Sequence, residues 1–236
     1  MAEARKTAPK VRSAARANAP AVVAIIVVNV VIFIAQLGSA GVTNRFAAFA
    51  PAIQNGEYYR LITAMFLHSP SFILHILFNM YILYAYGQNV EQAFGTLRFI
   101  VMYLVAGFMG SVASYAFGSC NAASVGASGA IFGVVGILVI YAYNRRTSAI
   151  MSQYLRGIMI FIGINMVISF GLPNIDYLAH IGGLLAGMAL GLGFDRGLVS
   201  GRARSVALQA AFVVAMVGVG VALLVWRTAN FAQLCG

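Results

Sequence analysis

The chain of 236 residues is 61% hydrophobic and only 8% charged, whereas soluble domains usually carry about 25% charged residues. A soluble domain of this length cannot bury so much apolar surface, so the composition excludes one and predicts an all-α polytopic membrane protein. The net charge of +10 does not indicate a nucleic-acid partner, because the basic residues are scattered over short segments rather than gathered in one stripe.

Seven charge-poor stretches are predicted to cross the bilayer, since each is close to the roughly 17–25 residues that a spanning helix needs. They are 20–38, 71–87, 98–118, 127–143, 157–172, 175–194 and 205–226. Residues 99–144 hold no charge but are too long for one helix, and the turn-forming run at 118–121 is the natural break.

The first 40 residues allow two interpretations. A basic start, an apolar run and the small residues Gly38-Ser39-Ala40 resemble a signal peptide with its cleavage site. We favour an uncleaved first span, because the length of the run and the distribution of basic residues both fit a membrane helix.

Basic residues predict the orientation of the spans. With the N-terminus inside, most of them lie at inner positions, namely Arg5, Lys6, Lys10, Arg12, Arg16, Arg98, Arg145, Arg146, Arg156, Arg196, Arg202 and Arg204. Arg45, Arg60 and Arg227 then lie outside. The positive-inside rule therefore predicts a cytoplasmic N-terminus and an outer C-terminus. We expect an integral membrane protein of the plasma (inner) membrane of a bacterium.

Cys120 and Cys235 both lie outside in this topology, which allows a bridge between them. Two cysteines are too few for a disulfide scaffold, so we favour two free thiols.

A nucleophile and a base open two of the apolar spans. Ser128 lies in Gly126-Ala127-Ser128-Gly129, and His180 lies in Ala179-His180-Ile181-Gly182-Gly183. A serine needs a positioned base to become a nucleophile, and histidine is the usual one. Because polar groups are costly in a membrane, their presence at a similar shallow depth below the outer surface predicts a catalytic Ser–His dyad.

Hydrogen-bond donors for a reacting carbonyl lie at the same depth. His75 and Asn79 are four residues apart and project from one helix face. Together with the Ser128 backbone amide at a helix start, they can stabilise an oxyanion. The alternative is that His75 and Asn79 make an interhelical hydrogen bond that holds two spans together.

Glycines predict that the serine and histidine helices approach closely. Two ridges begin beside the reactive groups, one of Gly129, Gly133 and Gly136, the other of Gly183, Gly187 and Gly191. Such small residues let helix backbones touch in lipid, which is predicted to bring Ser128 and His180 within hydrogen-bond reach.

Asp176 lies four residues before His180 and has two interpretations. It can orient His180 as a third triad member, or it can stabilise the first turn of its helix, with Asn174 or Asp176 near the cap. We favour the second interpretation and hence a dyad.

These residues resemble the rhomboid intramembrane serine proteases. The resemblance covers roughly residues 57–191 and rests on five ordered motifs, Glu57-Tyr58-Tyr59-Arg60-Leu61, His75-Ile76-Leu77-Phe78-Asn79-Met80, Glu91-Gln92-Ala93-Phe94-Gly95, Gly126-Ala127-Ser128-Gly129 and Ala179-His180-Ile181-Gly182-Gly183. It implies a six-helix rhomboid-like core plus a seventh C-terminal helix, with residues 39–70 as a long loop lying partly in the outer leaflet. We accordingly divide the chain into a basic cytoplasmic segment (1–19), the catalytic core (20–196) and an inner loop, seventh helix and outer tail (197–236).

The resemblance also implies the role of each site residue. Ser128 is the nucleophile, His180 the general base, and His75, Asn79 and the Ser128 amide the oxyanion hole. Gly126, Gly129 and Phe132 support the site, Arg60 and Glu91 are structural, and no metal or cofactor is needed. The chain departs from the family pattern at two positions. Phe132 replaces a tyrosine common in the family, but can still stack on the histidine, and His68 lies seven rather than five residues before His75, which we interpret as a loop position.

The predicted activity is that of an intramembrane serine endopeptidase that cleaves transmembrane segments of other proteins near the outer face. Zinc and aspartyl types fit poorly, because His-Glu-x-x-His is absent and the two aspartates, Asp176 and Asp195, lie at opposite ends of one span. The alternative is a non-catalytic rhomboid-like binder of transmembrane helices. A transporter is a weaker third hypothesis, since it would carry broken spans or buried charges at the midplane.

Overall fold

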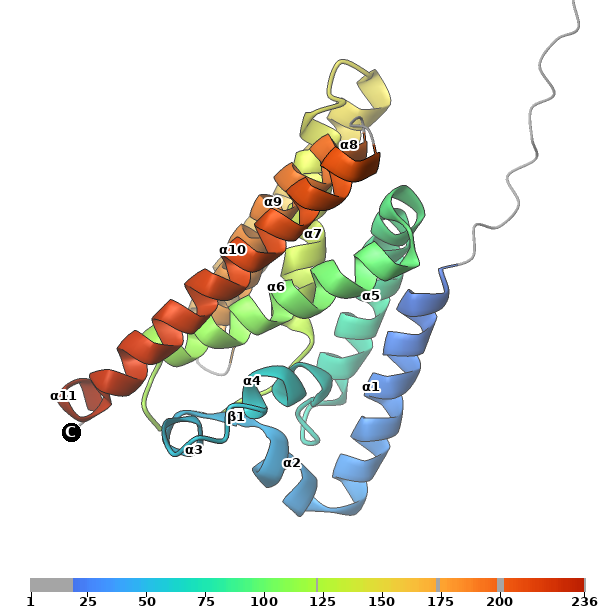
Figure 1. Cartoon of the computed structure of the whole chain (residues 1–236). Helices are drawn as coiled ribbons and strands as arrows, with labels where there is room; N and C mark the ends of the chain where they lie inside the picture. Colours follow the sequence, from blue (N-terminus) through green and yellow to red (C-terminus); the bar gives the residue numbers. More distant parts are fainter. Residues whose placement is uncertain (1–18, 122, 173–174, 199–201, 236) are drawn as a thin grey trace, which may run out of the picture.

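The fold consists of seven long helices and a group of short elements at one end of the bundle (Figure 1). It is known from a computed structural model that describes residues 19–121, 123–172, 175–198 and 202–235. The predicted basic segment up to residue 18 and the predicted cap Asn174 lie outside these residues. The long helices are α1 (Pro20–Gly38), α5 (Ile73–Phe94), α6 (Thr96–Phe117), α7 (Ser128–Tyr143), α8 (Ala149–Gly171), α9 (Tyr177–Leu198) and α10 (Arg202–Ala229).

The seven long helices correspond to the seven predicted spans, and an all-α polytopic membrane fold is confirmed. Within the described residues, α1, α6, α8, α9 and α10 are long and apolar enough to cross a membrane, while α7 is apolar but has only 16 residues. The predicted ends of four spans were wrong, those of α5, α8, α9 and α10, because a search for charge-free runs stops at the first charge. The α8 helix begins well before 157 and includes Arg156, and α5 continues past 87 to include Glu91.

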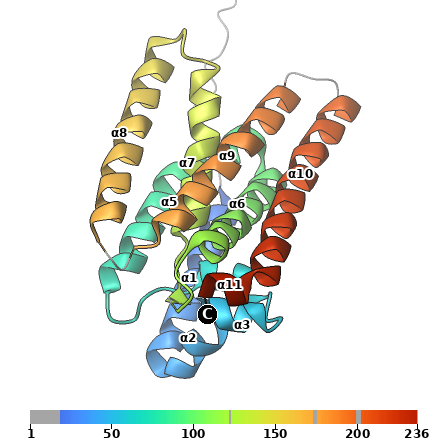
Figure 2. The same cartoon turned by 90° about the vertical axis from the view of Figure 1, so that its left-hand side faces the viewer.

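The α7 helix forms the centre of the bundle, with α9 packed along it (Figure 2). Nearly every residue of α7 is buried. The predicted glycine ridges face each other at this contact, so that a methyl group on Gly183 would clash with the Gly129 carbonyl, and one on Gly187 with the Gly133 carbonyl. The close approach of these two helices is therefore backbone against backbone.

A buried carboxylate joins α1 to the end of α5. Glu91 is 3% exposed and accepts hydrogen bonds from the Ala21 and Val22 amides, at 3.0 and 2.9 Å, and from Thr96 Oγ1 at 2.8 Å. The first amides of a helix have no partner within the helix and carry partial positive charge. Glu91, on α5, therefore caps the N-terminus of α1 and holds the two helices together there.

The short elements between α1 and α5 cover the end of the bundle where α7 begins. They are α2 (Ala40–Phe46), β1 (Ala48–Phe49), α3 (Ala50–Gln54), α4 (Arg60–Thr63) and the 3₁₀ helix η1 (Ala64–Phe66). Strand β1 pairs antiparallel with β2 (Ala123–Ser124), directly before the predicted nucleophile.

Arg60 holds this segment together. Its guanidinium donates to the carbonyls of Asn44 and Ala47, at 2.8 and 2.9 Å, and forms a 2.8 Å salt bridge with Glu57. The Tyr59 hydroxyl and Arg60 both hold the pKa of the Glu57 carboxyl below its ordinary value.

The expectation of two free thiols is wrong, because Cys120 and Cys235 form a disulfide. It joins the loop after α6 to α11 (Phe231–Cys235), the short helix that follows α10. Buried Arg227 lies against both sulfurs, with Nη2 at 3.3 and 3.2 Å. Sequence counting misses this pair because α10 must first pack against α6 and α9 to bring the cysteines together.

We expect Gly187→Ala to destabilise the protein by at least about 1–3 kcal/mol, because an added methyl group overpacks the contact with the Gly133 carbonyl. Thermal unfolding of the detergent-solubilised protein, followed by circular dichroism, measures this. Gly163→Ala on α8 is the matched control, since a methyl group there meets open space. Equal melting temperatures for the two variants would contradict the proposed packing.

The disulfide predicts the thiol reactivity of the purified protein. Without reductant we expect no reaction with a maleimide-polyethylene glycol, and after reduction we expect two adducts, resolved as steps in gel mobility. Cys120→Ser serves as the control, because it leaves Cys235 free to react without reductant. Two adducts on untreated wild-type protein would show that the bond is absent.

Candidate active site

Ser128 is the first residue of α7 and is half-buried. The loop before it reaches the helix through Gly126, whose φ of +137° lies in a region that residues with a side chain rarely adopt. The Gly126 amide donates to the Ala64 carbonyl at 3.0 Å, which ties the loop to η1. The turn before the serine is therefore positioned from outside its own helix.

His180 lies in the first turn of α9 and is 6% exposed. Its ring stacks on Phe132, one turn after Ser128, with 4.3 Å between centroids and 13° between planes. The adjacent Ala179 carbonyl lies against Gly129, where a Cβ would approach it to 3.2 Å. The glycine contact thus brings together the turns that carry the two predicted catalytic residues.

No hydrogen bond joins Ser128 and His180 among the described residues; the ring contacts instead Phe132 and Ser169. Catalytic hydrogen bonds are often long without substrate and tighten only when it binds. The dyad therefore stays a prediction, with its two members placed on adjacent helix starts.

His75 faces Ser128 across Gly126. A Cβ on Gly126 would lie 2.9 Å from His75 Nε2 and 3.6 Å from Ser128 Oγ. His75 Nδ1 accepts the Ser69 amide at 3.4 Å, so the ring proton is on Nε2. The N–H of His75 therefore points toward the loop that carries the serine, as an oxyanion donor requires.

Asn79 is buried one turn further along α5. Its Nδ2 donates to the His75 carbonyl of the same helix at 2.9 Å. Neither side chain bonds to another long helix within the described residues, so the alternative of an interhelical hydrogen bond through these two residues is not what the structure shows.

His68 is more than the loop residue that the spacing suggested. It lies in the loop before α5 but is 0% exposed, and its ring packs edge-on against His75 at 5.1 Å. The amide of Gln36 clasps its backbone on both sides, donating to the His68 carbonyl at 2.8 Å and accepting the His68 N–H at 3.0 Å. Because His68 is buried and its backbone is fixed by these two hydrogen bonds, its ring supports the ring of His75 from one side.

Asp176 caps α9 and does not contact the His180 ring. Its Oδ1 accepts the Ala179 amide at 3.0 Å, and its Oδ2 accepts the hydroxyls of Ser114 on α6 and Ser124 on β2, each at 2.5 Å. The carboxylate therefore locks the start of the histidine helix to the strand before the serine. This agrees with the favoured interpretation of a helix-start residue.

Ser169 is a site residue that the sequence analysis missed. It lies on α8, is 3% exposed, and its Oγ lies 2.9 Å from His180 Nδ1. A serine inside an apolar span is unremarkable by itself. The only available signal was its spacing of four residues from Asn165, which places two polar groups on one face of the span.

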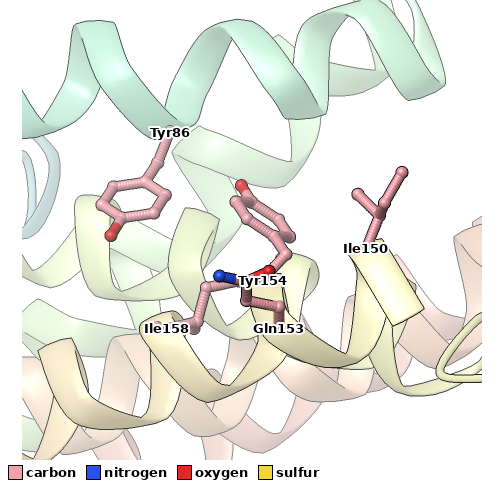
Figure 3. A pocket seen from close by; sticks show the side chains of 6 residues that line it. Tyr86, Ile150, Gln153, Tyr154 and Ile158 are labelled. Carbon is pink, nitrogen blue, oxygen red and sulfur yellow. The ribbon is translucent and has the colours of Figure 1, made fainter. Parts of the chain in front are cut away.

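A pocket lies between α5 and α8, away from these residues (Figure 3). It is lined by Tyr86, Ile150, Gln153, Tyr154, Gly157 and Ile158. These residues lie toward the ends of α5 and α8 that are far from Ser128, so the pocket is separate from the candidate active site. Within the described residues, no His, Cys, Asp and Glu side chains gather in threes as metal ligands.

The fold and these residues define a polytopic membrane protein with a serine and two histidines, Ser128, His180 and His75, at one end of the bundle. Residues 55–197 match the Rhomboid domain, and the chain belongs to the rhomboid family of intramembrane proteases. It is 41% identical over 148 residues to Rhomboid protease GluP of Bacillus subtilis (strain 168), which covers 59% of this chain and 27% of that protein.

Two further relatives match a similar share of this chain. RHOMBOID-like protein 6, mitochondrial, of Arabidopsis thaliana is 39% identical over 145 residues, 59% of this chain and 44% of the relative. Putative rhomboid protease YdcA of Bacillus subtilis (strain 168) is 32% identical over 138 residues, 58% of this chain and 68% of the relative. The chain thus spans less than half the length of the first two relatives.

We expect Asp176→Asn to lower stability by about 2 kcal/mol, because bonds to a charged acceptor contribute about 1.5–3 kcal/mol. Unfolding of Asp176→Asn, Ser114→Ala and the double variant forms a cycle that isolates the pair. Strict additivity of the two single effects would show that the Asp176–Ser114 bond contributes nothing.

Proposed function

We propose that the chain is an intramembrane serine endopeptidase that cleaves transmembrane segments of other membrane proteins near the outer face. The observation that carries this is the arrangement around Gly126 and Phe132. Ser128 faces Nε2 of His75 across Gly126, and the His180 ring stacks on Phe132, one turn after the serine in α7. Membership of a protease family supports the same conclusion.

In this mechanism His180 removes the proton of Ser128, and the serine oxygen attacks the scissile carbonyl. The developing oxyanion receives hydrogen bonds from His75 Nε2, Asn79 and the Ser128 amide, which is unpaired because it is the first of α7. His180 then passes its proton to the leaving amine, and water hydrolyses the acyl-enzyme. Gly126 and Gly129 keep the backbone around the nucleophile close-packed, and Phe132 holds the base.

The length of α7 supports access of water from the outer side. Its 16 residues extend about 24 Å at 1.5 Å per residue, several ångströms less than the roughly 30 Å of hydrocarbon in a bilayer. A helix start that lies below the surface and carries half-buried Ser128 allows a shallow aqueous recess. A substrate helix must unwind locally there to expose its scissile carbonyl, so small or helix-breaking residues are expected at the cleavage point.

The orientation of the protein in the membrane is inferred from features at the two opposite ends of the bundle, a disulfide at one end and arginines at the other. The disulfide lies at the end that carries Ser128, and disulfides persist in oxidising compartments. Arg98, Arg145 and Arg146 lie at or beyond the other ends of α6 and α7, as the positive-inside rule requires of a cytoplasmic face. We therefore infer a cytoplasmic N-terminus and an outer C-terminus, and we propose the plasma (inner) membrane of a bacterium as the membrane.

A fluorophosphonate probe tests the proposed chemistry on the purified, detergent-solubilised protein. We expect labelling of the wild type and its loss in Ser128→Ala and in His180→Ala, because an unactivated serine does not react. Ser71→Ala, in the loop before α5, is the control and is expected to label normally. Cleavage of a transmembrane substrate is expected to fall with labelling.

A folded wild type that does not label, or labelling that survives in Ser128→Ala, would contradict this function. In the first case the chain would be a non-catalytic binder of transmembrane helices, and Ser128→Ala would leave its cellular phenotype intact.

A further inference from the structure

The hydrogen bonds of Ser169 determine which ring nitrogen of His180 carries the proton. A serine hydroxyl has one hydrogen, and the shorter of the two contacts of Ser169 Oγ is the one of 2.6 Å to the Asn165 carbonyl, a group that can only accept. With the hydrogen assigned to that contact, the Ser169 oxygen accepts from His180 Nδ1, which lies 2.9 Å away. This assignment places the ring proton on Nδ1 and leaves a lone pair on Nε2.

We infer that Ser169 is a positioning residue that holds His180 in the Nδ1–H tautomer, with Nε2 free to take the proton of Ser128. This inference rests on the proposed protease function and adds a third member to the dyad. Asp176, the acidic candidate suggested by spacing, bonds to two serines and the Ala179 amide instead. The third member beside Ser128 and His180 is therefore Ser169, a neutral hydroxyl that donates its hydrogen to the Asn165 carbonyl.

The same bond strengthens during the reaction. When His180 accepts the serine proton it becomes a cation, and a hydrogen bond from a charged donor is worth more than one between neutral groups. Ser169 Oγ lies where the charge develops and is polarised by its own bond to the Asn165 carbonyl. Loss of the hydroxyl therefore affects the chemical step rather than substrate binding.

The helix that carries Ser169 is the least enclosed of those around the site. Figure 2 shows α8 along the outside of the bundle beside α7. Only Ile158 and Ser169 of α8 are buried. Phe161 of α8 also contacts the site, since its ring lies 6.2 Å from that of Phe132. Burial of a polar serine costs free energy unless it is paired, and Ser169 is paired both with the Asn165 carbonyl of its own helix and with the base.

Substitutions that differ only in the hydroxyl test the inference. Ser169→Thr and Ser169→Val have the same shape, and the first keeps the oxygen. We expect Val to lower kcat about tenfold or more with KM unchanged, and Thr to retain most of the wild-type rate. Ser152→Ala, near the other end of α8, is the control for general effects on that helix.

A spectroscopic signature separates this inference from the proposed function. The chain has three histidines, so ¹⁵N-histidine labelling gives few signals, and His180→Ala identifies the relevant one. We expect an Nδ1–H tautomer in the wild type and in Ser169→Thr, and a mixture of tautomers in Ser169→Val. This result supports the inference even if no serine reacts with the fluorophosphonate, an outcome that would overturn only the protease function.

Two outcomes overturn the inference. One is an Nε2–H tautomer of His180 in the wild type. The other is a folded Ser169→Val protein whose tautomer and kcat both match those of Ser169→Thr, because the hydroxyl would then have only a structural role in α8.

Discussion

The arrangement of the site depends on the backbone contact between α7 and α9. Without side chains at Gly183 and Gly187, the α9 backbone lies directly on the carbonyls of Gly129 and Gly133. This contact fixes the height of one helix relative to the other, and therefore which residues of their first turns are neighbours. Gly110 of α6 completes the junction, because a Cβ there would lie 2.8 Å from the Ala179 carbonyl. Three helices thus meet at the level where Ser128 and His180 begin their spans.

Polar side chains secure the ends of these helices, where the glycine contact no longer reaches. Glu91 caps α1 from α5, Arg60 gathers the carbonyls of the segment after α1, and Asp176 joins α6, β2 and α9. Buried polar groups are costly unless they are paired. Each of these groups has several partners, and those of Glu91 and Asp176 come from elements far apart in the chain, so each group fastens a loop or helix end that the apolar core does not define. The segment before Ser128 is held by the bond of Ser124 to Asp176 and by that of the Gly126 amide to the Ala64 carbonyl.

The sequence predicted most of the fold and the helices that carry the site, because glycine ridges and isolated polar residues in apolar spans are local signals. Span ends were missed where a charge such as Glu91 or Arg156 lies inside a helix. The Cys120–Cys235 bond and the contacts of Asp176 depend on tertiary packing, which spacing along the chain does not encode. Ser169 was missed for a further reason. A serine four residues after a polar residue is common in apolar helices, and its second bond, to His180, exists only once α8 packs beside α9.

The disulfide also bears on how the protein is assembled. Cys120 precedes the serine helix, and Cys235 follows the last long helix, so the bond closes a covalent ring that contains α7, α8, α9 and α10. Ser128, Ser169 and His180 all lie within that ring. Because Cys235 follows α10 in the chain, the ring can close only after α10 has been inserted with its end beside the loop after α6. Oxidation of this pair therefore reports that α10 has reached its place, and a chain truncated before α10 retains an unpaired Cys120 in the loop before the serine helix.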